Sequence, residues 1–259
     1  LSRDQMLLVV EANTSHIRMV QAARTRVFTG EEENAAERQT WDRPGWIGQM
    51  IEVEAKPQAP VRVEKTVSIF TSTDRASSEP VFEAREALKQ AGDFSALLAT
   101  HEQAWQHLWD CCDLELGNNQ QTHLVLRLHI FHLLQTCSVN TIDMDVGIPA
   151  RGLHGEAYRG HIFWDEMFIL PFINLRIPEL TRSVLKYRFR RLPEARVAAA
   201  EAGYEGAMFP WQSGSNGREE SQVLHLNPKS GRWLPDNTHL QRHVNVTIAY
   251  NIWLYYEAT

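Results

Sequence analysis

The sequence predicts a multidomain protein of the α+β class, and three observations support that prediction. Residues 5–73 contain short β-like runs separated by polar segments with Pro or Gly. Residues 79–115 carry apolar residues at helical spacing. After residue 120 the chain changes to long helical runs joined by polar loops. We therefore expect a β domain in residues 1–75, a helical linker in 76–117 and a helical domain in 118–259.

The β domain is predicted to be antiparallel. Its β-like runs fall at residues 6–10, 17–20, 50–53 and 61–70. In the run that begins at Val61, apolar and polar residues alternate, which is typical of strands with one buried face. This pattern favours part of an antiparallel β-sandwich.

The linker is predicted to hold two helices. The segment Thr71-Ser-Thr-Asp74 supplies turn and N-cap residues before a helical pattern over residues 81–98, which is interrupted near Gly92. A second helix is predicted from about residue 100 to Cys112. Helices that connect two domains are the simplest account of this region.

The helical domain is predicted from five apolar runs, and its long loops are rich in Gly and polar residues. The runs lie at residues 122–137, 166–175, 179–190, 194–202 and 239–259. The main loops are residues 147–160 and 210–237. Helices that alternate with long loops favour a bundle or toroid whose functional site is built from the loops.

Composition excludes several classes of partner and cofactor. A net charge of −6 without a basic run gives no electrostatic footprint for nucleic acid. No stretch approaches the ~18 apolar residues that a membrane span needs. The three cysteines lack C-x-x-C spacing and H-E-x-x-H is absent, so we expect no disulfide framework, no metal and a cytoplasmic location.

Both ends of the chain lack natural signals. The first residue is Leu1 rather than Met, and Thr259 follows an apolar helical pattern without a stop signal. We expect the sequence to be part of a longer protein.

The segment richest in reactive side chains is residues 150–165, which combines glycines, arginines, histidines, carboxylates, a Tyr and a Trp. Glycine lets backbone approach a ligand, an indole stacks on the C–H face of a sugar, and a carboxylate accepts two neighbouring hydroxyl protons. The alternative is that Trp164 and Asp165 only begin the next helix, as a hydrophobic staple and an N-cap. A second Gly- and Ser-containing loop places Trp211 beside polar residues, which suggests two rims of one pyranose pocket.

These segments resemble glycoside hydrolase family 65, which includes trehalose, maltose and kojibiose phosphorylases. The resemblance is carried, in the same order and with similar spacing, by His161-Ile-Phe-Trp-Asp165, Gly206-Ala-Met-Phe-Pro-Trp-Gln-Ser213 and residues 186–196 and 243–259. It covers essentially the whole chain, weakly in the β region. It implies an N-terminal β-sandwich, a helical linker and the first part of an (α/α)6 catalytic barrel.

The resemblance also implies roles for individual residues. Phe163, Trp164, Asp165 and Trp211 would line the subsite for the non-reducing glucose, with Gln212 beside them and His243 near the mouth of the pocket. The general acid of the family lies in a Gly-Pro-Asp-Glu type motif, which does not occur in this sequence. We therefore assign no catalytic residue, expect the acid and the phosphate-binding loop beyond Thr259, and expect this chain alone to be inactive.

The implied reaction is inverting phosphorolysis of an α-linked glucose disaccharide, of the trehalose, maltose or kojibiose type, to β-glucose 1-phosphate and glucose. The partners would be the disaccharide and inorganic phosphate as co-substrate, without a cofactor, and a homodimer is compatible with the resemblance. One alternative is hydrolysis of an α-glucoside such as trehalose by the same fold. Another is a non-catalytic protein that binds sugar.

The sequence departs from the commoner phosphorylase pattern at the pocket rim. It reads Trp164-Asp-Glu-Met-Phe168, one residue shorter than usual, and has Gln212 where Glu is usual. His154 and Ala157 stand where Thr and Gly are frequent. These departures leave the linkage specificity open.

Other polar and aromatic residues have simpler interpretations. We expect Glu219 and Glu220 to lie in a solvated loop, because adjacent residues diverge in direction. The run Arg188-Phe-Arg-Arg191 is interpreted as an exposed helix end. Trp253, Tyr255 and Tyr256 are expected in a helix core.

Overall fold

The computed structural model describes residues 2–75, 79–117, 119–152, 155 and 158–259. The chain divides into two compact units, Leu1–His107 and Leu108–Thr259. The expected division into three parts, at residues 75 and 117, stays a prediction.

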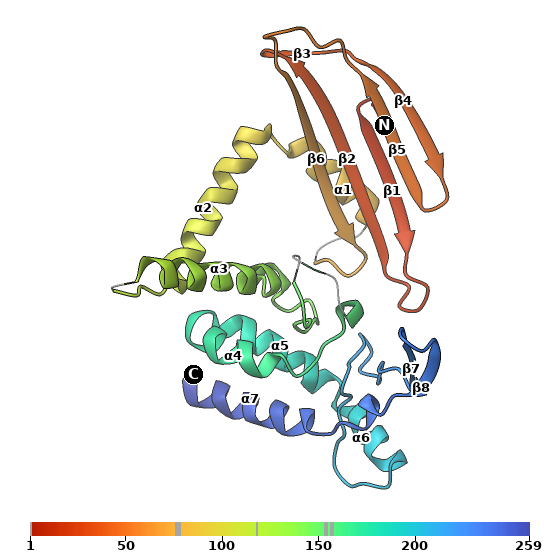
Figure 1. Ribbon diagram of the computed structural model, residues 1–259, viewed down its shortest axis with the longest axis vertical. Helices are drawn as coiled ribbons and strands as arrows, with labels where there is room; N and C mark the ends of the chain where they lie inside the picture. The colour runs from red at the N-terminus through yellow and green to blue at the C-terminus, as the bar shows by residue number, and fades with distance from the viewer. Residues whose placement is uncertain (1, 76–78, 118, 153–154, 156–157) are drawn as a thin grey trace. The chain divides into compact units, whose positions relative to one another are not determined.

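Antiparallel β structure dominates the first unit (Figure 1). Strand β2 pairs with β1, β3 and β6, and β4 and β5 form a separate hairpin. The predicted runs coincide with four strands, whereas β3 and β4 were not predicted, because β3 is two residues long and β4 is almost entirely polar. The strands are β1 (Gln5–Glu11), β2 (Arg18–Thr29), β3 (Glu32–Glu33), β4 (Glu37–Arg43), β5 (Trp46–Glu52) and β6 (Val61–Thr71).

Helix α1 (Pro80–Gln90) packs against this sheet. The Glu79 carboxylate accepts the Val81 N–H at 3.2 Å and begins the helix. Ala84 and Leu88 are buried in one cluster with Val20 of β2. These i and i+4 positions share a helix face, and this is the face that packs against the sheet.

The predicted interruption near Gly92 is confirmed, but the second helix begins earlier than predicted. Helix α1 ends at Gln90, and α2 runs from Phe94 to Cys112. The Asp93 carboxylate accepts the Ala96 N–H at 2.8 Å, which starts α2 directly after Gly92. Residues 94–98 therefore belong to the second helix, and the predicted start near residue 100 was wrong.

The second unit is mainly helical, with α4, α5 and α7 side by side (Figure 1). Its largest buried cluster joins Leu170 and Ile173 of α4 to Leu180 and Val184 of α5. The helices are α3 (Gln120–Thr136), α4 (Glu166–Arg176), α5 (Pro178–Arg190), α6 (Leu192–Glu201) and α7 (Val244–Ala258). The 3-10 turns are η1 (Val139–Thr141), η2 (Tyr158–Gly160) and η3 (Thr238–Leu240).

Local sequence explains most of these helix ends. The Asn119 side chain accepts the Thr122 N–H and caps α3. Pro178 occupies the first turn of α5, where its missing N–H costs nothing. Gly203, at φ +80°, follows the end of α6 in the left-handed conformation that favours glycine.

Three details of this unit differ from the prediction. A short hairpin, β7 (Leu224–Asn227) and β8 (Arg232–Pro235), interrupts the loop predicted at residues 210–237. The last helix begins at Val244 instead of residue 239, because η3 precedes it. Trp253 and Tyr256, expected in a core, are 53% and 77% exposed, since the elements described here leave that face of α7 uncovered.

Candidate functional site

The two sugar-binding loops predicted from the sequence are joined by backbone pairing. The Ile162 N–H donates to the Ser213 carbonyl at 3.1 Å, and the Ser213 N–H donates to the Ile162 carbonyl at 2.9 Å. Isolated bridges continue on either side, from Pro149 to Ile162 and from Ser213 to Glu219. This pairing holds Phe163 and its neighbours beside Trp211, although the two loops are about fifty residues apart in the sequence.

Aromatic rings form one wall of the site. The Trp164 and Trp211 rings are stacked, with centroids 6.0 Å apart and planes at 24°. The Phe163 ring meets Trp211 edge to face at 6.0 Å, and the His243 ring lies 4.7 Å from Trp211. Indole rings offer the apolar surface on which the C–H face of a pyranose ring can stack.

Asp165 stands at the position that precedes α4, but its side chain does not cap that helix. Its backbone is helical, with φ −56° and ψ −25°, and the carboxylate makes no capping hydrogen bond. Burial raises the pKa of this carboxyl above its ordinary value. The N-cap interpretation of Asp165 therefore lacks the hydrogen bond on which it depends.

These residues line one cleft of about 620 Å³. Five of the six predicted site residues contribute to its surface: Phe163, Trp164, Asp165, Trp211 and Gln212. His243 does not line the cleft; it stands at the N-terminal end of α7, where it contacts Trp211 without forming a capping hydrogen bond. A cleft of this volume is within the usual range for small-molecule sites.

Gln212 is held by a side chain from the other loop. Its Nε2 lies 2.6 Å from Nδ1 of His161. Burial and the nearby Arg159 cation lower the pKa of His161, which favours the neutral imidazole that can accept a hydrogen bond from the amide. The Gln212 amide is therefore oriented before any ligand arrives.

Glu219 is partly buried and hydrogen-bonded, whereas we expected it to lie in a solvated loop. Its carboxylate accepts the backbone N–H groups of Trp211 at 2.7 Å, Gln212 at 3.0 Å and Ser221 at 3.1 Å. The side chain folds back over the preceding segment because residues 213–219 form a tight return. Sequence adjacency to Glu220 gave no sign of this role.

Arg188 is buried, so the interpretation of residues 188–191 as an exposed helix end was wrong. Its guanidinium pairs with the Glu166 carboxylate at 3.1 Å, and both side chains are only 3% exposed. Its Nη2 also donates to the Phe163 carbonyl at 3.2 Å. The pair thus connects α5 to the start of α4, directly beside Asp165. Arg188 can be buried because the Glu166 carboxylate replaces the hydration that its guanidinium loses.

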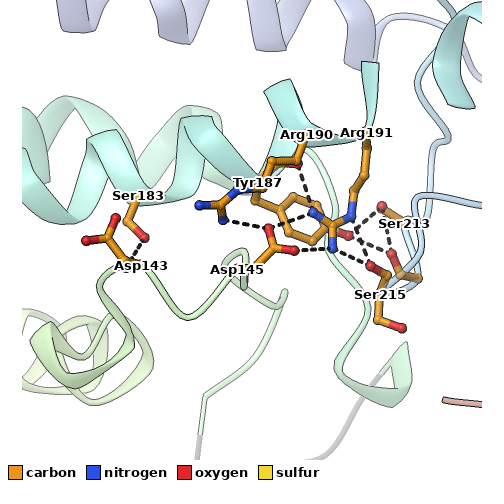
Figure 2. A network of polar contacts seen from close by, with 9 residues as sticks. Asp143, Asp145, Ser183, Tyr187, Arg190, Arg191, Ser213 and Ser215 are labelled. Atoms are coloured by element: carbon orange, nitrogen blue, oxygen red, sulfur yellow. Dashed lines mark hydrogen bonds and ion pairs between the residues drawn. The ribbon is translucent and has the colours of Figure 1, made fainter. Parts of the chain in front are cut away.

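Arg191 and Tyr187 hold the second loop in place through hydrogen bonds (Figure 2). The Tyr187 hydroxyl lies 2.8 Å from the Ser213 hydroxyl and donates to the Gly214 carbonyl at 2.6 Å. The Arg191 guanidinium stacks over the Tyr187 ring at 3.6 Å, pairs with Asp145 at 2.8 Å and donates to the Ser215 carbonyl. Of the predicted exposed cations, Arg190 alone is exposed.

The cleft also includes Tyr158 and Arg159, for which the sequence indicated no individual role although they lie in the segment 150–165. Arg159 lies in a left-handed turn with Tyr158 and Gly160, at φ +54°, +56° and +70°. Across the cleft, Thr238 donates its backbone N–H to Asp236 at 2.9 Å, and its hydroxyl also bonds that carboxylate, which lowers the pKa of Asp236. The further lining residues are Ala150, Ser221, Gln222 and Gln241. No local pattern marks Ser221, Gln222 or Gln241. The β7–β8 hairpin separates Gln222 from Gln241 in the sequence and brings Gln241 back to the cleft.

Three further predictions concern metal binding, membrane spans and two residues at the pocket rim. Among the residues that the structure describes, no group of three His, Cys, Asp or Glu side chains could hold a metal ion. The described helices include none long and apolar enough to cross a membrane. His154 and Ala157, where the sequence departs from the commoner pattern, lie outside the described residues.

Stacked indoles, a carboxylate and an oriented amide in one cleft are the side chains that the sequence motifs predicted for a pyranose pocket. Comparison with known proteins identifies the family. Residues 127–259 match the glycosyl hydrolase family 65 central catalytic domain, and residues 2–108 match the N-terminal domain of the same family. The chain therefore belongs to glycosyl hydrolase family 65, as the sequence motifs predicted, and it is related to enzymes.

Individual relatives support this assignment. The chain is 44% identical over 256 residues to an uncharacterized glycosyl hydrolase of Mycobacterium tuberculosis, covering 99% of this chain and 19% of that protein. It is 37% identical over 215 residues to trehalose 6-phosphate phosphorylase of Lactococcus lactis subsp. lactis, covering 82% of this chain and 28% of the relative. This chain thus spans less than a third of the length of either protein.

A solved structure shows the same fold. It is a protein from the human microbiome that carries the name of kojibiose phosphorylase, with a TM-score of 0.71 and 20% sequence identity. The match covers 97% of this chain and 31% of that structure. The antiparallel β unit and the helical unit are thus shared, whereas the closed sandwich and the (α/α)6 barrel remain predictions.

Proposed function

We propose that this chain forms the glucose-binding part of an enzyme that cleaves an α-linked glucose disaccharide by inverting phosphorolysis. The observation that carries the proposal is the position of the Asp165 carboxylate, which lines the cleft beside Trp164 and Trp211 and does not cap α4. The products would be β-glucose 1-phosphate and glucose.

Each side chain of the cleft has a role in this proposal. The stacked indoles of Trp164 and Trp211 contact the apolar face of the glucose ring. The Asp165 carboxylate accepts hydrogen bonds from two neighbouring hydroxyls, and the Gln212 amide binds a further sugar oxygen. Phe163 and His243 support the Trp211 ring from its edge and its outer side.

The chemistry requires two groups besides this grip on glucose. A carboxylic acid donates a proton to the glycosidic oxygen as its bond to C1 breaks, and a phosphate oxygen attacks C1 from the opposite face. We propose that residues outside this chain supply the acid and the phosphate site. Two facts support this: the Gly-Pro-Asp-Glu type motif is absent from the sequence, and the chain spans 28% of the matched phosphorylase.

The disaccharide is proposed to be of the trehalose, maltose or kojibiose type. Relatives named kojibiose phosphorylase match 80% or more of the chain at 30 to 34% identity. Inorganic phosphate would be the co-substrate, without a cofactor. The proposed location is the cytoplasm, which three free cysteines support.

Hydrolysis is the second candidate, because a kojibiose hydrolase is also 36% identical over 166 residues. The deciding experiment measures release of glucose from these disaccharides by the complete protein, with and without inorganic phosphate. Phosphorolysis predicts that the rate depends on phosphate and that the sugar phosphate has the β configuration by NMR. An equal rate of sugar release without phosphate would overturn the proposal in favour of hydrolysis.

A further inference from the structure

Glu219 connects to the substrate cleft only through the backbone of the residues that line it. Its Oε2 accepts the Trp211 N–H at 2.7 Å, and its Oε1 accepts the Gln212 N–H at 3.0 Å. Trp211 and Gln212 line the cleft, and Glu219 does not. Glu219 instead lines a second hollow, of about 540 Å³, together with Pro210. Its carboxylate therefore approaches the Trp211 segment from the side that faces away from the substrate.

The three hydrogen bonds of Glu219 are charge-assisted and converge on one carboxylate. Trp211 and Gln212 are 7% and 8% exposed, so water does not readily replace the carboxylate as the partner of their N–H groups. A carboxylate is well suited to this place because its two oxygens offer about four acceptor sites in fixed directions. The third bond, to the Ser221 N–H at 3.1 Å, ties the return of the same loop to the same group.

We propose that Glu219 is a positioning residue that sets the direction of the Trp211 indole and the Gln212 amide into the substrate cleft by binding the backbone N–H groups of both residues. The inference rests on the proposed function, since it assumes that this cleft binds a glucoside. Glu219 transfers no proton and touches no substrate. Glu219 fixes the backbone dihedral angles of Trp211 and Gln212. These angles set the directions of the two side chains that contact the sugar.

The chain offers a matched control in Glu220. It follows Glu219 directly, is also partly buried, and donates its backbone N–H to the Gln212 carbonyl at 2.9 Å. Its carboxylate neither lines the cleft nor forms any of the three bonds described above. Glu219→Gln and Glu220→Gln therefore remove the same charge from adjacent residues, but Glu219→Gln alone places an amide N–H₂ against a backbone donor.

The test is steady-state kinetics of the complete protein with Glu219→Ala, Glu219→Gln and Glu220→Gln. Glu219→Ala is expected to raise KM for the glucoside about tenfold to a hundredfold, which corresponds to the free energy of about one charge-assisted bond, with KM for phosphate unchanged. Glu219→Gln should lie between Glu219→Ala and the unaltered protein, which Glu220→Gln should match. A fall in kcat with both KM values unchanged would indicate a structural role alone and overturn the proposal, as would equal effects of Glu219→Gln and Glu220→Gln.

A spectroscopic measurement separates this inference from the proposed function. The stacked indoles of Trp164 and Trp211 should give an exciton contribution to circular dichroism, identified as the signal lost in Trp211→Phe. Glu219→Ala is expected to reduce that contribution, and Glu220→Gln to preserve it, in the absence of any substrate. An unchanged contribution in Glu219→Ala would overturn the inference. If Glu219→Ala reduces the exciton contribution as expected but the complete protein cleaves no α-glucoside, the inference about Glu219 stands and the proposed function is overturned.

Discussion

Asp165 is the side chain whose replacement tests the cleft most directly. A hydrogen bond to a charged group contributes about 1.5–3 kcal/mol. If the carboxylate binds two neighbouring hydroxyls, Asp165→Asn keeps one acceptor oxygen and should lower kcat/KM by roughly 10- to 100-fold. Asp165→Ala loses both bonds, about 3–6 kcal/mol, and should lower kcat/KM by roughly 10²- to 10⁴-fold.

The assay is initial-rate kinetics of the complete protein, with thermal unfolding measured in parallel. Because Asn caps helices about as well as Asp, a simple capping role predicts normal activity and stability for Asp165→Asn. Our reasoning predicts the loss of activity with a change in unfolding free energy below about 1 kcal/mol, the contribution of a charge at a helix N-terminus. Near-normal kcat/KM in Asp165→Asn would refute the assignment of Asp165 to the sugar.

The pH dependence of the same residue has a defined sign. Burial raises the pKa of Asp165 in the folded protein, so its protonated form is relatively favoured there. The contribution of Asp165 to stability is then fully present below the unfolded-state pKa and is lost as pH rises through the folded-state pKa. On acidification, glucoside binding should weaken as Asp165 is protonated, at a pH above the ordinary Asp range, while Asp165 itself does not destabilise the fold.

Two further substitutions test the scaffold. Glu166→Gln leaves the Arg188 cation buried without its carboxylate, so urea unfolding should show a loss of about 3–5 kcal/mol in the free energy of unfolding. The double substitution Glu166→Met with Arg188→Met should largely restore the stability. Equal stability of Glu166→Gln and the unaltered protein would contradict the buried pair. Gly147→Ala places a Cβ about 2.6 Å from Cδ1 of Ile162, so overpacking should cost about 1–3 kcal/mol in thermal unfolding and raise KM for the glucoside; an unchanged melting temperature would show that Ile162 yields freely.

Helix ends and strand positions followed from local sequence, because their causes are local. Asn119 caps α3 through a group three residues away, and Pro178 starts α5 by its fixed φ. Alternation placed β6, and helical spacing indicated α1 without showing which of its residues would be buried. The polar strand β4 and the hairpin β7–β8 escaped prediction, because their pairing depends on partners that a hydrophobic pattern does not reveal.

The candidate site shows the same division between what the local sequence predicts and what the fold decides. The sequence by itself determined the residue types of the cleft, since Phe163, Trp164, Asp165 and Trp211 stand in recognisable motifs. Which carboxylates face the cleft and which support it was decided by the tertiary structure alone.

Burial and hydrogen bonding across the fold assign those supporting roles. Arg188 is buried because it meets Glu166 from another helix, and Glu219 supports the cleft because a tight return brings its carboxylate to the Trp211 and Gln212 N–H groups. In the linear sequence both residues belong to ordinary charged runs. Their roles arise because a charge is retained in a protein interior only where the fold supplies its partners, and those partners come from other parts of the fold.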